Sequence, residues 1–400
     1  MTIGIQLKET PAHASPPSSS SGPKHVRVYP GFDALPEGYP GVFDSQASPD
    51  FHLTLPWFSN FVATALDPGD AVRLYSVESE SQNGNAAVAA LLPMRASTSR
   101  QPAMEPRTLA SLTNYYTCLF GPLLAPGAAS AECLHSIASA IASEHPRWDM
   151  VRVNPLPHDS ASFSEMNAAF KSAGFATQEF FSFGNWFLPV EGRSFEQYME
   201  GRPSVLQNTF RRKAKKLEQT GRARIEIVAQ REGLEKAIAD YGKVYSASWK
   251  VPEPHPEFMP GLIRTCAELG WLRLGLVYMD DLPVATQLWI VHHGVASIYK
   301  LAYDEKFAPF SVGTILTARL MQHALDVDRV HEVDYLSGDD DYKKTWMSHR
   351  RERWGLMAFN PRTVKGALAM TRHIGGRKLK RAYEKFARRG GPAKDAPAIS

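Results

Sequence analysis

The sequence has 400 residues, of which 44% are hydrophobic, 10% aromatic and 22% charged, and its formal net charge is a modest +4. These proportions exclude wholesale disorder, and the length predicts two domains. The sequence contains neither a run of about 18 apolar residues nor a secretory signal pattern, so we expect a cytoplasmic protein without integral membrane contact.

The three cysteines, Cys118, Cys133 and Cys266, lie far apart in the sequence. Their spacing fits neither a metal site nor a disulfide framework, and their odd number fits a reducing compartment. We therefore predict three ordinary buried thiols and no metal cofactor.

The N-terminal half begins with a segment rich in Ser and Pro, and residues 1–24 are predicted to be a disordered tail. Residues 25–192 alternate strand-like and helix-like segments and are predicted to form an N-terminal domain. The expected strands are Ala71–Glu78, Asn85–Met94 (approached through the Asn83-Gly84 turn), Asp149–Pro155 and Thr177–Leu188, and the expected helices are Ala129–Ser143 and Ser162–Ala173.

The second half repeats this style. Residues 193–390 are predicted to form a C-terminal domain, and residues 391–400 a flexible tail. The expected strands are Ala223–Val228, Leu272–Met279, Val284–His292, Ala296–Tyr303, His331–Leu336 and Trp354–Phe359, and the expected helices are Glu232–Ser248, Glu257–Leu269, Gly313–Leu325, Asp340–Met347 and a long terminal helix. An antiparallel meander, a crossover helix and a further strand predict an α/β (α+β) fold with two tandem domains. Each domain is expected to have a mixed, mostly antiparallel sheet flanked by helices.

Two groups of basic residues stand out, one at Arg211–Lys216 and one that runs from Arg372 to Arg389. Such groups attract the phosphates of a nucleotide cofactor, a tRNA or an anionic lipid. A solvated helix face explains each group equally well.

A helix is expected to start at Ser311-Val312-Gly313-Thr314, directly after a strand and a short loop. The N-terminus of a helix exposes unpaired backbone N–H groups and the positive end of its dipole, a geometry that binds pyrophosphate. Gly313 would let the backbone approach such a ligand closely. Alternatively, Ser311 only caps the helix.

A second segment of interest is the acidic loop that contains Gly338 and precedes the helix at Asp340. Asp339 is placed at a strand end, where it could accept a proton, and the phenol of Tyr342 could donate one to a leaving thiolate. Lys343 could pair with an acid or a phosphate. The alternative is that Asp339, Asp340 and Asp341 only cap the helix.

These two segments resemble the GNAT superfamily, in the branch of cellulose-biosynthesis-type acetyltransferases, which is related to the Fem peptidyltransferases. The resemblance covers roughly residues 195–360, and residues 30–190 loosely. It rests on Tyr303-Asp304, on the Ser311-x-Gly313-Thr314-x-Leu316 helix start, and above all on Asp334-Tyr335-x-x-Gly338-Asp339-x-x-Tyr342-Lys343-x-x-Trp346. It implies a bacterial-type acyltransferase with two tandem GNAT-like domains.

The resemblance implies acetyl-CoA or another acyl-CoA as co-substrate, bound where the strands Ala296–Tyr303 and His331–Leu336 separate. The pyrophosphate would lie at Phe310, Ser311, Val312, Gly313 and Thr314, with Tyr303 and Lys343 also in the cofactor site. An amine or hydroxyl of a small-molecule or saccharide acceptor would attack the thioester directly, with Asp339 as base and Tyr342 as acid. The residues expected to line the acceptor pocket are Trp249, Lys250, Gln287, Trp289 and Asp304.

Two alternatives stay open. A Fem-type transferase would take its acyl group from aminoacyl-tRNA and hold the RNA with Arg211–Lys216 and Arg377–Arg389. A catalytically inactive binding protein of the same fold would explain why the phosphate loop contains only Gly313 and starts without a basic residue. No DNA partner is expected, and neither the acceptor nor the oligomeric state follows from the sequence.

Overall fold

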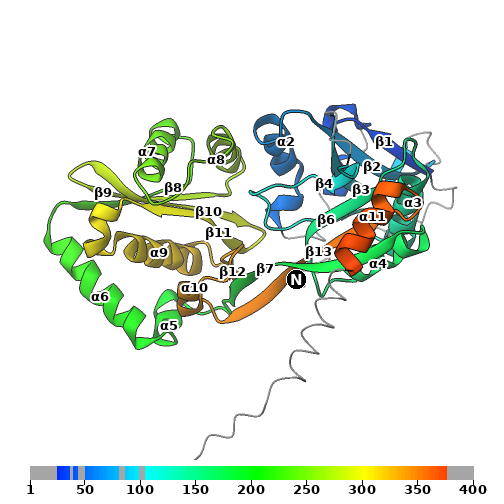
Figure 1. Ribbon diagram of the computed structural model, residues 1–400. Helices are drawn as coiled ribbons and strands as arrows, with labels where there is room; N and C mark the ends of the chain where they lie inside the picture. The colour runs from blue at the N-terminus through cyan, green and yellow to red at the C-terminus, as the bar shows by residue number, and fades with distance from the viewer. Residues whose placement is uncertain (1–24, 37–38, 44–49, 81–85, 99–103, 376–400) are drawn as a thin grey trace, which may run out of the picture.

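The computed structural model describes residues 25–36, 39–43, 50–80, 86–98 and 104–375. Both predicted tails (1–24 and 391–400), the Asn83-Gly84 turn and the basic residues Arg377–Arg389 lie outside these ranges. The described part forms two lobes joined by one continuous sheet (Figure 1). The predicted α/β fold of two tandem domains with mixed sheets is confirmed.

Among the residues that the structure describes, the N-terminal half contains strands β1 to β7 and the α-helices α1 to α4. The strands are β1 (His25–Tyr29), β2 (Asp70–Glu80), β3 (Ala86–Ser97), β4 (Thr108–Ser111), β5 (Leu123–Leu124), β6 (Met150–Pro157) and β7 (Ala176–Pro189), and the helices are α1 (Pro40–Phe43), α2 (Leu55–Thr64), α3 (Ser130–Ser143) and α4 (Ala161–Ser172). Local signals set these bounds. Helix α4, for example, begins where the Ser160 hydroxyl accepts a hydrogen bond from the Phe163 N–H at 3.2 Å, and the chain leaves it at Gly174, with a φ of 90°.

The C-terminal half contains the remaining strands β8 to β13. They are β8 (Ala223–Val228), β9 (Leu272–Met279), β10 (Leu282–His292), β11 (Val295–Tyr303), β12 (Glu332–Asp334) and β13 (His349–Phe359), and the helices are α5 (Phe195–Glu200), α6 (Ser204–Gln219), α7 (Leu234–Ser246), α8 (Phe258–Glu268), α9 (Val312–Gln322), α10 (Asp341–Trp346) and α11 (Val364–Met370). A 3-10 helix, Glu305–Phe310, precedes α9. The predicted meander is confirmed as β9, β10 and β11, and the predicted crossover helix as α9.

The predicted terminal helix is seen only as a short one. Helix α11 continues into a π-helical turn, Thr371–Gly375, and the chain beyond is outside the described residues.

The two halves exchange strands at the centre of the sheet. The strand order is β1-β2-β3-β4-β6-β13-β7-β12-β11-β10-β9-β8, so β13, from the end of the chain, lies between β6 and β7 of the N-terminal half. Its eleven residues pair antiparallel with β7, from His349 opposite Phe187 to Phe359 opposite Ala176. The end of β7 in turn pairs with β12 of the C-terminal half. Figure 1 shows β7 and β13 running together between the lobes.

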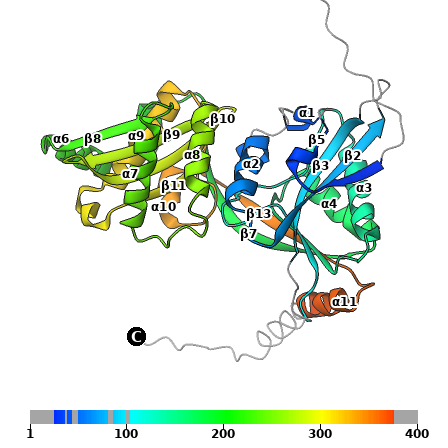
Figure 2. The same ribbon diagram turned by 90° about the horizontal axis from the view of Figure 1, so that it is seen from above.

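Helices cover both faces of each half. Helices α3 and α4 pack on one face of the N-terminal sheet, whereas α7 and α8 cover one face of the C-terminal sheet and α9 the other. Helix α2 lies beside α8 in both views (Figures 1 and 2). Trp57 of α2 meets Phe258 of α8 edge to face at 5.5 Å between ring centroids, and both side chains are fully buried. One hydrophobic core therefore spans the two halves.

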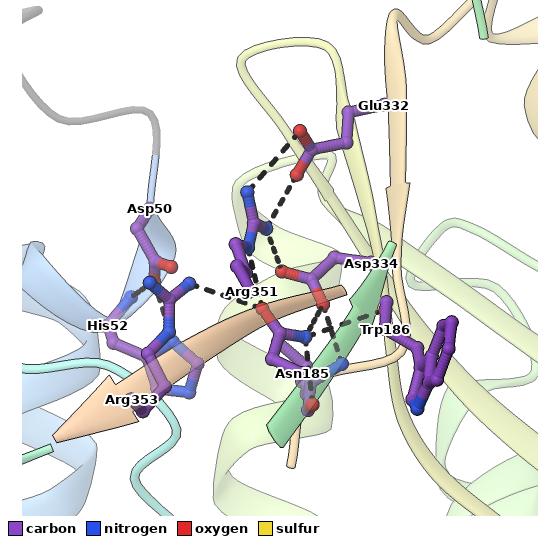
Figure 3. Close-up of polar contacts among 9 residues, drawn as sticks. Asp50, His52, Asn185, Trp186, Glu332, Asp334, Arg351 and Arg353 are labelled. Carbon is purple, nitrogen blue, oxygen red and sulfur yellow. Dashed lines mark hydrogen bonds and ion pairs between the residues drawn. The ribbon is translucent and has the colours of Figure 1, made fainter. Parts of the chain in front are cut away.

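A polar network fastens the exchanged strands to β12 (Figure 3). The buried Asp334 carboxylate accepts hydrogen bonds from Asn185 of β7 at 2.5 Å, from Arg351 of β13 at 2.5 Å and from the Leu336 backbone N–H at 2.6 Å. Arg351 also donates to Glu332 at 2.7 Å. Each charged group of the network has an opposite charge or a hydrogen-bond partner, which offsets the cost of its desolvation.

Strands β11 and β12 open a gap in the sheet. They pair in parallel over three positions only, from Val295 opposite Glu332 to Ser297 opposite Asp334. Beyond these positions β11 continues to Tyr303, whereas the chain after β12 stays with β7, because the Tyr335 N–H donates to the Trp186 carbonyl at 2.9 Å. The two strands therefore separate towards the start of α9.

Candidate active site

A cavity of about 540 Å³ lies where β11 and β12 separate, and we call it the donor cavity after the role that we propose for it below. Its walls come from the end of β11, the start of α9, the chain from β12 through α10, the start of α6 and the segment after α7. The residues that line it are Pro203, Val205, Leu206, Thr209, Trp249, Lys250, Gln287, Leu301, Tyr303, Gly313, Thr314, Thr317, Tyr335, Asp340, Tyr342, Thr345 and Trp346. Seven of the predicted site residues are among them: Trp249, Lys250, Gln287, Tyr303, Gly313, Thr314 and Tyr342.

The start of α9 faces this cavity with its backbone. Ser311 has a φ of 57°, and its side chain makes no capping hydrogen bond to α9. The alternative role of Ser311 as a side-chain cap is therefore not seen. Gly313 lies against Tyr303, and a Cβ atom placed on it would stand 3.2 Å from the ring. A side chain at this position would occupy the space between α9 and the end of β11.

Gln287 of β10 ties this helix start to the sheet. Its buried amide donates to the Gly313 carbonyl at 3.1 Å and to the Thr317 hydroxyl at 2.7 Å, and it accepts from the Trp289 indole at 2.9 Å. All the polar atoms of the Gln287 amide group therefore have partners within the protein. Gln287 positions the cavity wall, and its hydrogen-bonding capacity is used internally.

Several predicted site residues lie away from the cavity. Trp289 and Val312 are buried in the hydrophobic core, Asp304 accepts a hydrogen bond from the Lys306 N–H at 3.0 Å, and Phe310 packs beneath Lys216. Ser311 does not line the cavity either. Of the predicted phosphate loop, only Gly313 and Thr314 thus line the donor cavity.

The carboxylates of Asp339 and Asp340, in the acidic loop, point in different directions. Asp339 forms an ion pair with Arg350 of β13 at 2.6 Å and accepts from the Trp186 indole at 2.9 Å. The hydrogen bonds from Arg350 lower the pKa of Asp339 below its usual range. Asp339 lines neither the donor cavity nor the smaller cavity that adjoins it and is described below. Asp340 lines both cavities. The structure thus brings Asp340, and not the predicted Asp339, to the cavity.

Tyr342 lies in the first turn of α10 with its ring edge-on to Tyr335, at 5.6 Å between ring centroids. Burial raises the pKa of the Tyr342 phenol to about 12, and the nearby Asp340 carboxylate acts in the same direction. Tyr342 therefore keeps its proton at neutral pH and can act as a hydrogen-bond donor or an acid in the cavity.

A second, smaller cavity of about 180 Å³ adjoins the first, and we call it the acceptor cavity. The two cavities share Lys250, Leu301, Tyr335, Asp340 and Tyr342 as wall residues. The predicted Lys343 lines the smaller one only, as do Tyr115, Tyr116 and Cys118 of the N-terminal half. Sequence reasoning missed Tyr115 and Tyr116, because no pattern along the chain connects residues that are more than 200 positions away from α10.

All three cysteines are buried, as predicted. Among the residues that the structure describes, no group of three or more His, Cys, Asp or Glu side chains has the arrangement of a metal site. Within the same ranges, each helix is too short or too polar to cross a membrane.

Comparisons with known proteins agree with this geometry. Residues 204–344 match the family described as an acetyltransferase (GNAT) domain. Both cavities lie largely within this range. The match supports acyl transfer as the general reaction. No curated protein matches the sequence.

The fold also resembles solved structures. The crystal structure of FemX superimposes with a TM-score of 0.54 at 11% identity, over 81% of this chain and 96% of that chain. A tandem GNAT protein from the clavulanic acid biosynthesis pathway gives a TM-score of 0.47 at 11% identity, over 84% and 98% of the two chains. L-PGS from Bacillus licheniformis gives 0.44 at 10% identity, over 82% and 97%. Over the 81% of the chain that superimposes, the fold is thus similar to that of FemX.

Proposed function

We propose that this protein transfers an acyl group from acyl-CoA to an amine, as a GNAT-type acyltransferase of the cellulose-biosynthesis-type branch. The observation that carries the proposal is the donor cavity, which opens where two parallel strands separate and ends at the start of α9. An extended thioester fits between separated strands, because β11 beyond Ser297 has backbone groups that β12 does not pair.

The start of α9 would hold the negative end of the donor. Its first N–H groups carry the positive end of the helix dipole, and the Ser311 side chain does not cap them. Gly313 and Thr314 bring this end of the helix to the cavity wall. The N–H groups of β11 would polarise the thioester carbonyl in the same way as an oxyanion hole.

The acceptor nitrogen would approach from the acceptor cavity, on the other side of the shared wall. Once deprotonated, the amine attacks the thioester carbonyl, so that a C–N bond forms, the C–S bond breaks and the nitrogen gives its second proton to solvent. We assign the base to Asp340, which lines both cavities and receives the proton that the acceptor ammonium releases. Tyr342 gives its proton to the departing thiolate and regains one from solvent.

The donor is tested by calorimetric titration of the purified protein with acetyl-CoA and with CoA. We expect binding in the micromolar range for the wild type and a loss of at least about 100-fold for Gly313→Trp, because an indole at this position would fill the space beside Tyr303. Gly242→Trp is the matched control, since Gly242 is exposed on α7 and a Cβ atom there would meet nothing within 4 Å.

Folded wild-type protein that binds neither acetyl-CoA nor CoA would overturn the acyl-CoA donor. Equal loss of binding in both variants would show that the effect is not local to the cavity. Release of free thiol on addition of candidate acceptors then measures the transfer itself.

A Fem-type aminoacyl-tRNA donor is the second candidate, and helix α6 favours it. Its exposed Arg211, Arg212 and Lys215 surround a surface hollow that shares Val205 and Thr209 with the donor cavity. A polyanion that entered the donor cavity would therefore pass this basic face. Filter binding of aminoacyl-tRNA tests this candidate. It predicts a steep fall of affinity with salt and a weaker salt dependence in Arg211→Ala/Arg212→Ala.

A further inference from the structure

The acceptor cavity collects three lysine side chains in a small space. Lys250, Lys300 and Lys343 line it together with Asp340, Tyr115 and Tyr342. Each lysine comes from a different part of the fold: the segment after α7, strand β11 and helix α10. Like charges held close together in a partly buried site repel one another unless anionic groups compensate them.

Two of the three ammonium groups have such partners within the protein. Lys343 contacts the Ser337 carbonyl and forms an ion pair with Asp340 at 3.4 Å. Lys300 forms an ion pair with the buried Glu253 at 3.0 Å and donates to the Tyr115 hydroxyl at 3.1 Å.

Lys250 differs from the other two. Across the described residues, no carboxylate lies within ion-pair range of its Nζ atom, which stands 5.6 Å from the centroid of the Trp249 ring. Burial lowers the pKa of Lys250, and the charge of Lys300 lowers it further; Glu253 and Asp340 act in the opposite direction, and Lys343 in the same direction as Lys300. The amine thus stands in the shared wall of the two cavities without an ion-pair partner among the described residues.

We propose that the acceptor is a small amino acid-like molecule, with its carboxylate held by Lys250 and its amine placed against Asp340. This inference rests on the proposed acyl transfer and names the class of its acceptor. An ammonium group suits Asp340, because that carboxylate is 59% exposed and only loosely paired with Lys343. An amine there lies at the shared wall, next to the donor cavity, where the thioester carbonyl would stand.

The remaining walls fit the rest of such a molecule. Tyr115 and Tyr116 contribute aromatic rings to the wall. The Lys300 ammonium makes a cation–π contact with the Tyr115 ring, 4.3 Å from its centroid. The cavity of about 180 Å³ is large enough for a single amino acid. Lys250 would thereby select acceptors by charge, while Asp340 orients the nucleophile.

The test compares matched acceptors with the full-length protein and acetyl-CoA. Each amino acid is assayed beside its decarboxylated amine and its amide by release of free thiol, and phosphorylated amines form a further arm. We expect kcat/KM to be about 10- to 100-fold higher for the best amino acid than for its decarboxylated amine, as for a hydrogen bond to a charged group.

Three variants separate charge recognition from other roles of the lysine. In Lys250→Met the preference for the carboxylate should collapse through a rise in KM, whereas Lys250→Arg should restore it to within about fivefold, because a guanidinium also binds a carboxylate but does not act as a base. Lys171→Met, on the exposed face of α4, is the matched control and should behave as the wild type.

Equal use of amino acids and decarboxylated amines by the wild type would overturn the inference while leaving acyl transfer intact, as would exclusive use of phosphorylated amines. Amino-acid binding is also measured by calorimetry without any donor. Binding that Lys250→Met abolishes would support the acceptor site even if acetyl-CoA does not bind. Absence of amino-acid binding in a protein that does bind acetyl-CoA would contradict the acceptor site alone.

Discussion

At the scale of single residues, burial acts on two neighbouring groups with different consequences. Tyr342 and Lys250 both lie in the wall between the cavities. Burial raises the pKa of the tyrosine to about 12 and lowers the pKa of the lysine. In both cases the neutral form is favoured, so the phenol retains its proton and the ammonium loses its proton more easily than in water.

The first prediction concerns Tyr342→Phe. If the phenol protonates the leaving thiolate, its loss should lower kcat by about 10²- to 10³-fold with little change in the affinity for acyl-CoA. Since the pKa of Tyr342 is about 12, its own deprotonation should not reduce kcat of the wild type at any pH below about 10. Stopped-flow and steady-state assays of thiol release measure both effects. Tyr278→Phe, which removes a phenol hydrogen-bonded to Asp240 away from both cavities, is the control.

The second prediction concerns the pH dependence of acceptor binding. Lys250 faces Lys300 on β11, Lys343 and Asp340 at α10, and Glu253 in its own segment, and the two lysines add to the effect of burial on its pKa. Only the ammonium form attracts a carboxylate, and its pKa is lowered. The KM for an amino acid should therefore rise at a lower pH than the ordinary lysine value of about 10.4 predicts. In Lys250→Arg this rise should vanish, because the guanidinium stays charged. A KM that is flat with pH in the wild type would contradict the assignment.

At the scale of elements, the sequence predicts those helices and strands that local hydrophobic periodicity and turn residues determine. The meander β9 to β11, the crossover helix α9 and strand β12 follow from periodicity and turn residues, and they create the gap between β11 and β12. Which of two adjacent carboxylates enters the cavity does not follow from them. Arg350 of β13 holds Asp339 outside, and the chain turns at Gly338, with a φ of 105°, before Asp340 reaches the wall. The position of Asp339 therefore depends on β13, which pairs with β6 and β7 of the N-terminal half.

The third prediction tests the junction of β7, β12 and β13. Asp334→Ala should destabilise the protein by about 3–5 kcal/mol, because it removes the buried acceptor that Arg351, Asn185 and the Leu336 N–H share. Urea denaturation followed by circular dichroism measures the free energy of unfolding. Glu232→Ala, at an exposed position before α7, should change it by less than about 0.5 kcal/mol. A change of similar size in both variants would show that the network contributes no net stability.

At the scale of the whole molecule, the exchanged strands join the two halves in one continuous sheet. Strand β13 pairs with β6 on one side and β7 on the other, and it is separated from both by about 160 residues or more of chain. Hydrophobic alternation predicts that residues near 354–359 form a strand, but it carries no information about the partner strands. The same holds for Tyr115 and Tyr116, which reach the acceptor cavity only because the shared core of α2, α7 and α8 fixes the N-terminal half against the C-terminal one.

The last prediction follows from this exchange. A chain that ends at Ser348 retains all the residues that line the two cavities but lacks β13. Removal of β13 would leave β6 and β7 without the strand that lies between them. It would also remove Arg351, which forms an ion pair with Asp334. We expect this chain to lose cooperative unfolding and binding of acetyl-CoA together, whereas a chain that ends at Gly375 should keep both. Scanning calorimetry and titration with acetyl-CoA measure the two properties. If the shorter chain bound acetyl-CoA like the longer one, the C-terminal half would be able to fold without the shared strand, and the halves would be independent domains.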